Sequence, residues 1–139
     1  MSFGAAAAGR GRRPPAGAAC PCGSGSAFSE CCGPVLDGVP AATPESLVRS
    51  RYTAFALGDR AHLVRSWHPA TRPDFIDLDA ETQWLGLTIV GASESGARGT
   101  VEFRARWRDA ASRTTGELHE TSRFWQVAGQ WVYLDGEIA

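Results

Sequence analysis

The sequence predicts an α+β fold, in which helices pack on one face of a curved antiparallel sheet and a small cysteine-rich segment precedes them. Three observations lead to this prediction. All four cysteines fall between Cys20 and Cys32, apolar residues follow helical spacing after Thr43, and the period changes to two from Trp84 onward. Because the helices come first and a run of strands follows, we expect the strands to form a meander.

Composition limits the range of functions. The 139 residues, 43% hydrophobic and 21% charged, suffice for one domain with a core plus an appendage. A formal net charge of −1 provides no field that attracts nucleic acid or an anionic membrane, so neither is expected as a partner. No apolar run approaches the roughly 20 residues of a membrane span. The Ala/Gly/Pro-rich start lacks the order of a secretory signal, so we expect a cytoplasmic protein with a disordered tail at residues 1–19.

The cysteines occupy residues 20–33, a segment that we call the knuckle. They form two close pairs separated by eight residues: Cys20, Cys22, Cys31 and Cys32. Four soft ligands in this arrangement suit tetrahedral zinc, and Gly23 and Gly25 let the backbone curl between the pairs. Disulfides, which need an oxidising compartment, and reactive thiols are the alternatives. A closed four-cysteine site has no open coordination position, so the zinc is expected to be structural.

Two helices are predicted after the knuckle. Residues 34–42 are expected to be a linker, because Gly and Pro occur there at the density of a loop. Thr43 is a favourable N-cap for the first helix, and Gly58 ends it. Asp59 caps the second helix, which Pro69 stops. Residues 72–79 are irregular, and a short helix is possible before Trp84.

Strands are predicted where apolar and polar residues alternate. They cover WLGLTIVGAS at 84–93, VEFRARWRDA at 101–110, GELHETSRFWQV at 116–127 and WVYLDGEI at 131–138. In the second of these, Val101, Phe103, Ala105 and Trp107 are expected to face the core, and Glu102, Arg104, Arg106 and Arg108 to face solvent. Residues 43–139 therefore form one α+β domain.

The knuckle resembles a known zinc-binding segment. CPCGSG followed by CCG is similar to the SEC-C motif, named after the C-terminus of the SecA translocation ATPase. The motif consists of Cys-x-Cys, eight residues, Cys, and then Cys or His, so the four cysteines occupy its ligand positions. The resemblance implies zinc binding and a protein partner from the translation or translocation machinery. Residues 26–30 lack the lysines usual in the motif, which disfavours phosphate, RNA and lipid headgroups as partners.

A second resemblance covers most of the chain. The blocks ATPESLVRSRYTAFALGD, WHPATRP, WLGL, LHETSRF and WVYLDG are similar to those of the YchJ-like family of uncharacterised bacterial proteins. Its members join a SEC-C motif to a domain with the cone fold of nuclear transport factor two and ketosteroid isomerase. The resemblance implies a cystatin-like cone for residues 43–139. Cone-fold domains often dimerise through the sheet, so a homodimer is expected by analogy.

Cones of this kind leave an interior pocket, and polar residues are candidates to face it. We name six: Arg49, Tyr52, His68, His119, Arg123 and Asp135. A His–Asp pair could perform acid–base chemistry, and the arginines could hold a carboxylate or a phosphate. The alternative is structural: His68 caps a helix end, and Arg49 or Arg51 pairs with Glu120 or Asp135 to pin helix to sheet.

Two functions stay open at this point. The first is a zinc-binding protein-interaction module, in which Cys22→Ser abolishes partner binding while the cone stays folded. The second is a small-molecule-binding protein or enzyme with its site in the cone cavity, in which His68 or His119 is required for binding. The sequence assigns no catalytic residue.

Overall fold

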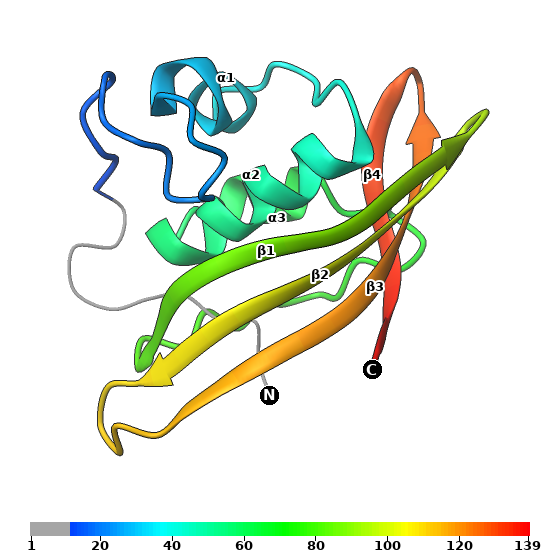
Figure 1. Ribbon diagram of the computed structural model, residues 1–139. Coiled ribbons are helices and arrows are strands. Elements are labelled where there is room, and N and C mark those ends of the chain that lie inside the picture. The colour runs from blue at the N-terminus through cyan, green and yellow to red at the C-terminus, as the bar shows by residue number, and fades with distance from the viewer. Residues whose placement is uncertain (1–11) are drawn as a thin grey trace.

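The computed structural model describes residues 12–139, so residues 1–11 of the expected tail lie outside the described part (Figure 1). In chain order the elements are the 3-10 helix η1 (Phe28–Glu30), the helices α1 (Cys32–Leu36), α2 (Pro44–Leu57) and α3 (Arg60–Arg65), and the strands β1 (Thr82–Ser95), β2 (Arg98–Asp109), β3 (Thr115–Val127) and β4 (Gln130–Ile138). The strands form one antiparallel sheet in the order β1-β2-β3-β4. The sheet curves around α2, which confirms the predicted α+β class (Figure 1).

The core lies between α2 and the inner face of the sheet. On β2, Val101, Phe103 and Ala105 are buried, as the alternation predicts, and Arg104 on the opposite face is exposed. These side chains belong to the same hydrophobic cluster as Leu47 of α2. Burying an apolar side chain of this size contributes about 1.5–3 kcal/mol, so this contact holds helix and sheet together.

The predicted ends of α2 are confirmed. The Thr43 hydroxyl accepts a hydrogen bond from the Ser46 amide at 3.0 Å, and Pro44 occupies the first turn. Gly58 ends the helix in the left-handed conformation. The helix is therefore fixed at both ends by local sequence, which sets the orientation of every side chain along it.

Helix α3 ends earlier than predicted. Asp59 caps it as expected, but the helix stops at Arg65 and not at Pro69. Beyond Ser66 the chain joins the sheet: Trp67 forms a parallel bridge with Tyr133, and the His68 amide donates to the Tyr133 carbonyl at 2.7 Å. This pairing to β4 replaces the last helical turn. The short helix considered before Trp84 is absent from the described chain, because β1 already begins at Thr82.

A buried histidine connects α3 to α2. The Ser50 hydroxyl donates to the Leu47 carbonyl at 2.9 Å, so it accepts a hydrogen bond from His62 Nε2 at 2.9 Å. On the other side of the ring, Arg65 donates to His62 Nδ1 at 3.1 Å. Burial, together with the positive charges of Arg51 and Arg65, lowers the pKa of His62 from 6.5 to about 3. The imidazole is therefore neutral in the folded protein.

This histidine makes stability depend on pH. As the pH falls below the ordinary histidine pKa, His62 becomes protonated in the unfolded chain but stays neutral in the folded protein. The free energy of unfolding therefore decreases as the pH falls through the window from 6.5 to about 3. Between about pH 6.5 and pH 5 the loss is about 2 kcal/mol. Urea unfolding at several pH values should show a smaller decrease for His62→Gln than for wild type. Equal decreases would contradict the assignment, and comparing the two proteins cancels acid effects on the cysteines.

The N-terminal part of the described chain is more ordered than predicted. The Phe28 amide donates to the Ala18 carbonyl at 2.8 Å, and Arg13 forms an ion pair with Asp37 at 2.7 Å. Residues 12–19, expected to belong to the tail, thus contact both the knuckle and the residue that follows α1. In the expected linker, α1 covers the first residues, and Val35 and Leu36 are buried. None of the helices within residues 12–139 has the length and apolar character of a membrane span.

Candidate metal centre

The knuckle gathers the four cysteine sulfurs into one cluster. All four Sγ atoms lie within 4.8 Å of one another, with Cys22 and Cys31 at 3.5 Å and Cys31 and Cys32 at 4.0 Å. A tetrahedral ion with metal–sulfur bonds of about 2.3 Å places its thiolates about 3.7 Å apart. No disulfide joins these four cysteines, and the cluster can hold one metal ion.

Local sequence explains how the cluster forms. The turn closes through hydrogen bonds from the Cys20 amide to the Ser26 carbonyl and from the Gly23 amide to the Cys20 carbonyl. Gly23 and Gly25 have φ values of 76° and 90°, a region that disfavours residues with a Cβ. In the second pair, Cys31 joins η1 to α1 and Cys32 is the first residue of α1.

Helix α2 supports the cluster from one side. Thr53 donates to the Cys32 sulfur at 3.3 Å, and Arg49 donates to the Cys22 carbonyl at 3.0 Å and lies 3.8 Å from its sulfur. Glu45, one turn earlier, accepts a hydrogen bond from Arg49 at 3.1 Å. Because these three residues are spaced by four, they share one face of the helix. The cluster is thus packed on the cone, and three of its cysteines are buried.

The cluster is electrostatically asymmetric. Hydrogen bonds with Cys20 and Cys32 lower the pKa of the Cys22 thiol, whereas hydrogen bonds with Cys20 and Cys22 raise the pKa of Cys32. Burial raises the pKa of Cys31, to which Ser24 lies at 3.2 Å. Negative charge therefore gathers first at Cys22, next to the Arg49 guanidinium. A thiolate beside a cation and N–H or O–H donors is ready to ligate a metal.

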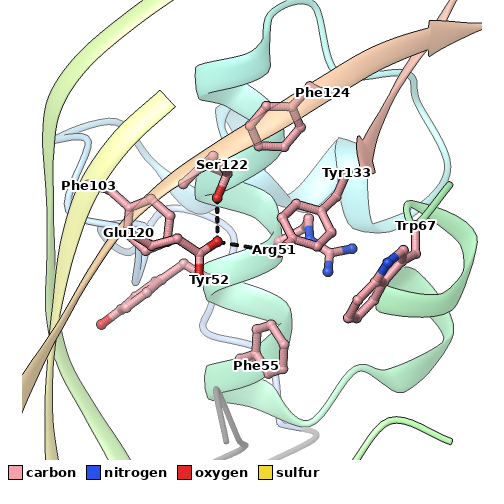
Figure 2. A pocket seen from close by; sticks show the side chains of 10 residues that line it. Arg51, Tyr52, Phe55, Trp67, Phe103, Glu120, Ser122, Phe124 and Tyr133 are labelled. Carbon is pink, nitrogen blue, oxygen red and sulfur yellow. Dashed lines mark hydrogen bonds between the residues drawn. The ribbon is translucent and has the colours of Figure 1, made fainter. Parts of the chain in front are cut away.

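A separate cavity of about 90 Å³ lies between α2 and the sheet (Figure 2). Its wall consists of Val48, Arg51, Tyr52, Phe55, Trp67, Phe103, Glu120, Ser122, Phe124 and Tyr133. The wall is mainly aromatic, but it includes a buried arginine and a carboxylate. The cone therefore does have an interior pocket.

The structure brings only one of the six pocket candidates to this cavity. Tyr52 lines it, and burial raises the pKa of this tyrosine to about 12. Arg49 lies at the cysteine cluster, and His68 packs on Trp125 at a centroid distance of 5.5 Å. The placement of Arg49 and His68 in the pocket is thus not supported.

The other three candidates lie on the outer face of the sheet. His119 contacts Glu102 at 2.6 Å, and Arg123 forms ion pairs with Asp135 at 2.6 Å and with Glu137 at 3.0 Å. Strand alternation is the reason: because the even-numbered residues from Glu120 to Phe124 face the cavity, His119 and Arg123 point away from it. These charges form the solvated side of the sheet.

The sequence contained signals for the residues that were missed. Glu120 lies four residues before Phe124 on β3, so alternation places both on the inner face. Arg51 lies three residues after Val48 and four before Phe55, within the apolar stripe of α2. We considered Arg51 and Glu120 as partners in a structural pair between helix and sheet, and neither was among the six pocket candidates.

Comparison with known proteins agrees with this architecture. Residues 43–136 match the model of the YchJ middle NTF2-like domain, and residues 18–34 match the SEC-C motif. A UPF0225 protein of Streptomyces coelicolor is 48% identical over 122 residues, covering 85% of this chain and 94% of that protein. A UPF0225 protein of Chromobacterium violaceum is 43% identical over 130 residues, covering 88% and 94% respectively.

Two solved structures have the same fold. The solution structure of a SEC-C motif containing protein from Rhodopseudomonas palustris has a TM-score of 0.78 and 40% identity, covering 88% of this chain and 99% of that one. The crystal structure of a sec-c motif containing protein from Psychrobacter arcticus has a TM-score of 0.70 and 29% identity, covering 86% and 82%. With a knuckle of the SEC-C type packed on an NTF2-like cone, the chain belongs to the YchJ-like UPF0225 family.

Proposed function

We propose that the knuckle binds zinc and that the zinc is structural. Four thiolates without a carboxylate or an open position form the donor set that favours a closed zinc site. The spacing of the sulfurs, up to 4.8 Å, fits a tetrahedral ion after small adjustments. The donors from Ser24, Arg49 and Thr53 offset part of the negative charge of four thiolates.

We further infer that the zinc-bound knuckle is a protein-interaction module. The observation that carries this function is a depression of about 240 Å³ between the knuckle and the start of α2. Its wall consists of Glu30, Cys31, Cys32, Thr43, Glu45, Ser46 and Arg49. One edge of the metal site thus opens onto a surface hollow that a partner side chain can enter.

The charge of this depression indicates the kind of partner. Glu30 is exposed, and Glu45 contributes a second carboxylate that Arg49 balances. A zinc ion with four thiolates adds a charge of about −2. The hollow is therefore negative overall and suits a protein segment with basic residues. Together with the SEC-C resemblance, this favours a cytoplasmic partner from the translation or translocation machinery.

Affinity capture with charge-reversed variants tests the proposal. Zinc-loaded wild type, Glu30→Arg and Asp74→Arg are crosslinked in cells, and captured proteins are identified by mass spectrometry. Glu30→Arg reverses the charge of the depression without touching a cysteine. Asp74→Arg makes the same change on the exposed loop between α3 and β1 and is the matched control. Zinc content is measured for each protein, so that loss of metal and loss of partner are distinguished.

The two results have different meanings. A protein set that wild type and Asp74→Arg capture, and that zinc-loaded Glu30→Arg loses, supports a docking surface at the knuckle. Equal capture by all three proteins would show that the depression is not the docking surface. Wild type purified without zinc would overturn the metal assignment directly.

A further inference from the structure

The cavity of the cone contains a buried cation that forms no ion pair with a carboxylate of residues 12–139. Arg51 is only 6% exposed, and its Nη1 donates to the Leu63 carbonyl at 3.1 Å and to the Ser66 hydroxyl at 2.7 Å. Its guanidinium lies over the rings of Trp67 and Tyr133, at 4.9 Å and 4.7 Å from their centroids. The direct contacts of Arg51 within residues 12–139 are thus with neutral groups, and Glu120 attracts it only from beyond hydrogen-bonding distance. Burying a cation in this way costs free energy that a nearby anion would offset.

A second donor in the same wall lacks an acceptor. Trp67 Nε1 is buried and has no hydrogen-bond partner within residues 12–139. Figure 2 shows the indole beside the Arg51 guanidinium, which also lies next to the Tyr133 ring. An unsatisfied buried N–H costs about 1–3 kcal/mol. An acceptor in the cavity that reached both groups would satisfy the indole and balance the charge of the arginine.

A carboxylate lies on the opposite wall of the cavity. Glu120 of β3 accepts hydrogen bonds from the Ser122 hydroxyl at 2.6 Å and from the Tyr133 hydroxyl at 3.4 Å (Figure 2). Both bonds go to Oε2, which fixes the orientation of the group. A plain anion in the cavity would be repelled by this charge, whereas a molecule that also carries a donor would bind it. The two walls together favour a ligand that carries both an anionic group, for Arg51, and a hydrogen-bond donor, for Glu120.

The remaining surface and the volume limit the size of the ligand. Phe55, Phe103 and Phe124 supply apolar walls. At roughly 10–15 Å³ for each water-sized position, the cavity holds about six to nine such groups. This suits a molecule with the size of leucine and excludes a nucleotide or a sterol.

We propose that the cavity binds a small organic acid with a hydroxyl or ammonium group next to its carboxylate and a short apolar body. The carboxylate meets Arg51 and the Trp67 indole, the adjacent donor meets Glu120, and the apolar body packs on the phenylalanines. This site lies apart from the knuckle and needs no protein partner, so its test does not depend on the outcome of the test of the proposed function.

NMR titration of the metal-loaded full chain tests the proposal. The probes share one carbon skeleton: 2-hydroxy-4-methylpentanoate, leucine, 4-methylpentanoate and the uncharged 4-methylpentanamide. We expect the indole N–H signal of Trp67 to shift on binding of the first two. 4-Methylpentanoate, which lacks the donor, should bind about tenfold more weakly, and the amide should not bind measurably.

Three variants locate the binding. Arg51→Gln should weaken binding of the hydroxy acid about ten- to a hundredfold. Glu120→Gln should strengthen binding of 4-methylpentanoate, because it removes the repulsion, and should reduce the advantage of leucine. Val48→Phe fills the cavity from α2 and should abolish all binding, which keeps the test decisive where Arg51→Gln fails to fold.

The contrary results are equally specific. The proposal is overturned where neither acid moves the Trp67 signal at about 10 mM, or where the amide binds as tightly as the acids. Binding that persists unchanged in folded Val48→Phe would place the ligand outside the cavity and overturn it as well.

Discussion

Cys22→Ser is expected to lower the melting temperature of the whole domain by at least about 15 °C. Cys22 and Cys32 are fully buried, and they belong to the same hydrophobic cluster as Leu47 of α2. Structural zinc contributes roughly 10–16 kcal/mol in zinc-finger peptides, which equals or exceeds the stability of an ordinary domain. The structure thus leads to a different expectation from the sequence, which treated the cone as independent of the knuckle.

Circular dichroism melting of metal-loaded protein measures this effect, with the metal content determined for each sample. Chelation of wild type should produce the same decrease as the cysteine variant. Ser24→Ala, which removes a donor to Cys31 but no ligand, is the control and should lose about 1 kcal/mol. A cone that melts at the wild-type temperature in Cys22→Ser would show that the two parts are energetically separate.

Phe124→Ala is expected to cost about 3–5 kcal/mol of unfolding free energy. Phe124 is 1% exposed, lies on the inner face of β3 and packs edge-on against Tyr133 at a centroid distance of 5.9 Å. Its removal enlarges the cavity next to α2, and packed cores relax only partly around such a space. The lost unfolding free energy therefore includes both the burial of the phenyl ring and the cost of the empty space that it leaves.

Urea unfolding with metal present measures the change, and Phe75→Ala is the matched control. Phe75 is 69% exposed and contacts the Arg60 guanidinium at 5.3 Å, so its loss should cost less than about 1 kcal/mol. A cost below about 1.5 kcal/mol for Phe124→Ala would show that helix and sheet close over the space.

The sequence predicted the regular elements well because their signals are local. Thr43 and Gly58 determine the ends of α2, and strict alternation determines the inner face of β2. The elements that differed depend on distant partners. α3 stops at Arg65 because Trp67 pairs with Tyr133, and residues 12–19 are ordered because Ala18 pairs with Phe28. No local pattern in the sequence records such pairings.

The two sites were predictable to different degrees. The four cysteines were found because metal ligands are identified by residue type and spacing, and the structure gathers them. The cavity was located in the correct domain, but of the six residues selected for it only Tyr52 lines its wall, and Arg51 and Glu120 were named only as partners in a structural pair. Its charged residues, Arg51 and Glu120, break the rule that charge faces solvent. The protein partner, the cytoplasmic location and the homodimer stay predictions.

Helix α2 contributes to both sites, and this has a thermodynamic consequence. One face, with Glu45, Arg49 and Thr53, meets the cysteine cluster, and the adjacent face, with Val48 and Arg51, forms the cavity wall. Whatever factor a molecule in the cavity adds to metal affinity, the metal must add to the affinity of that molecule. Because one helix carries residues of both sites, a change in the occupancy of either site would then change the affinity of the other.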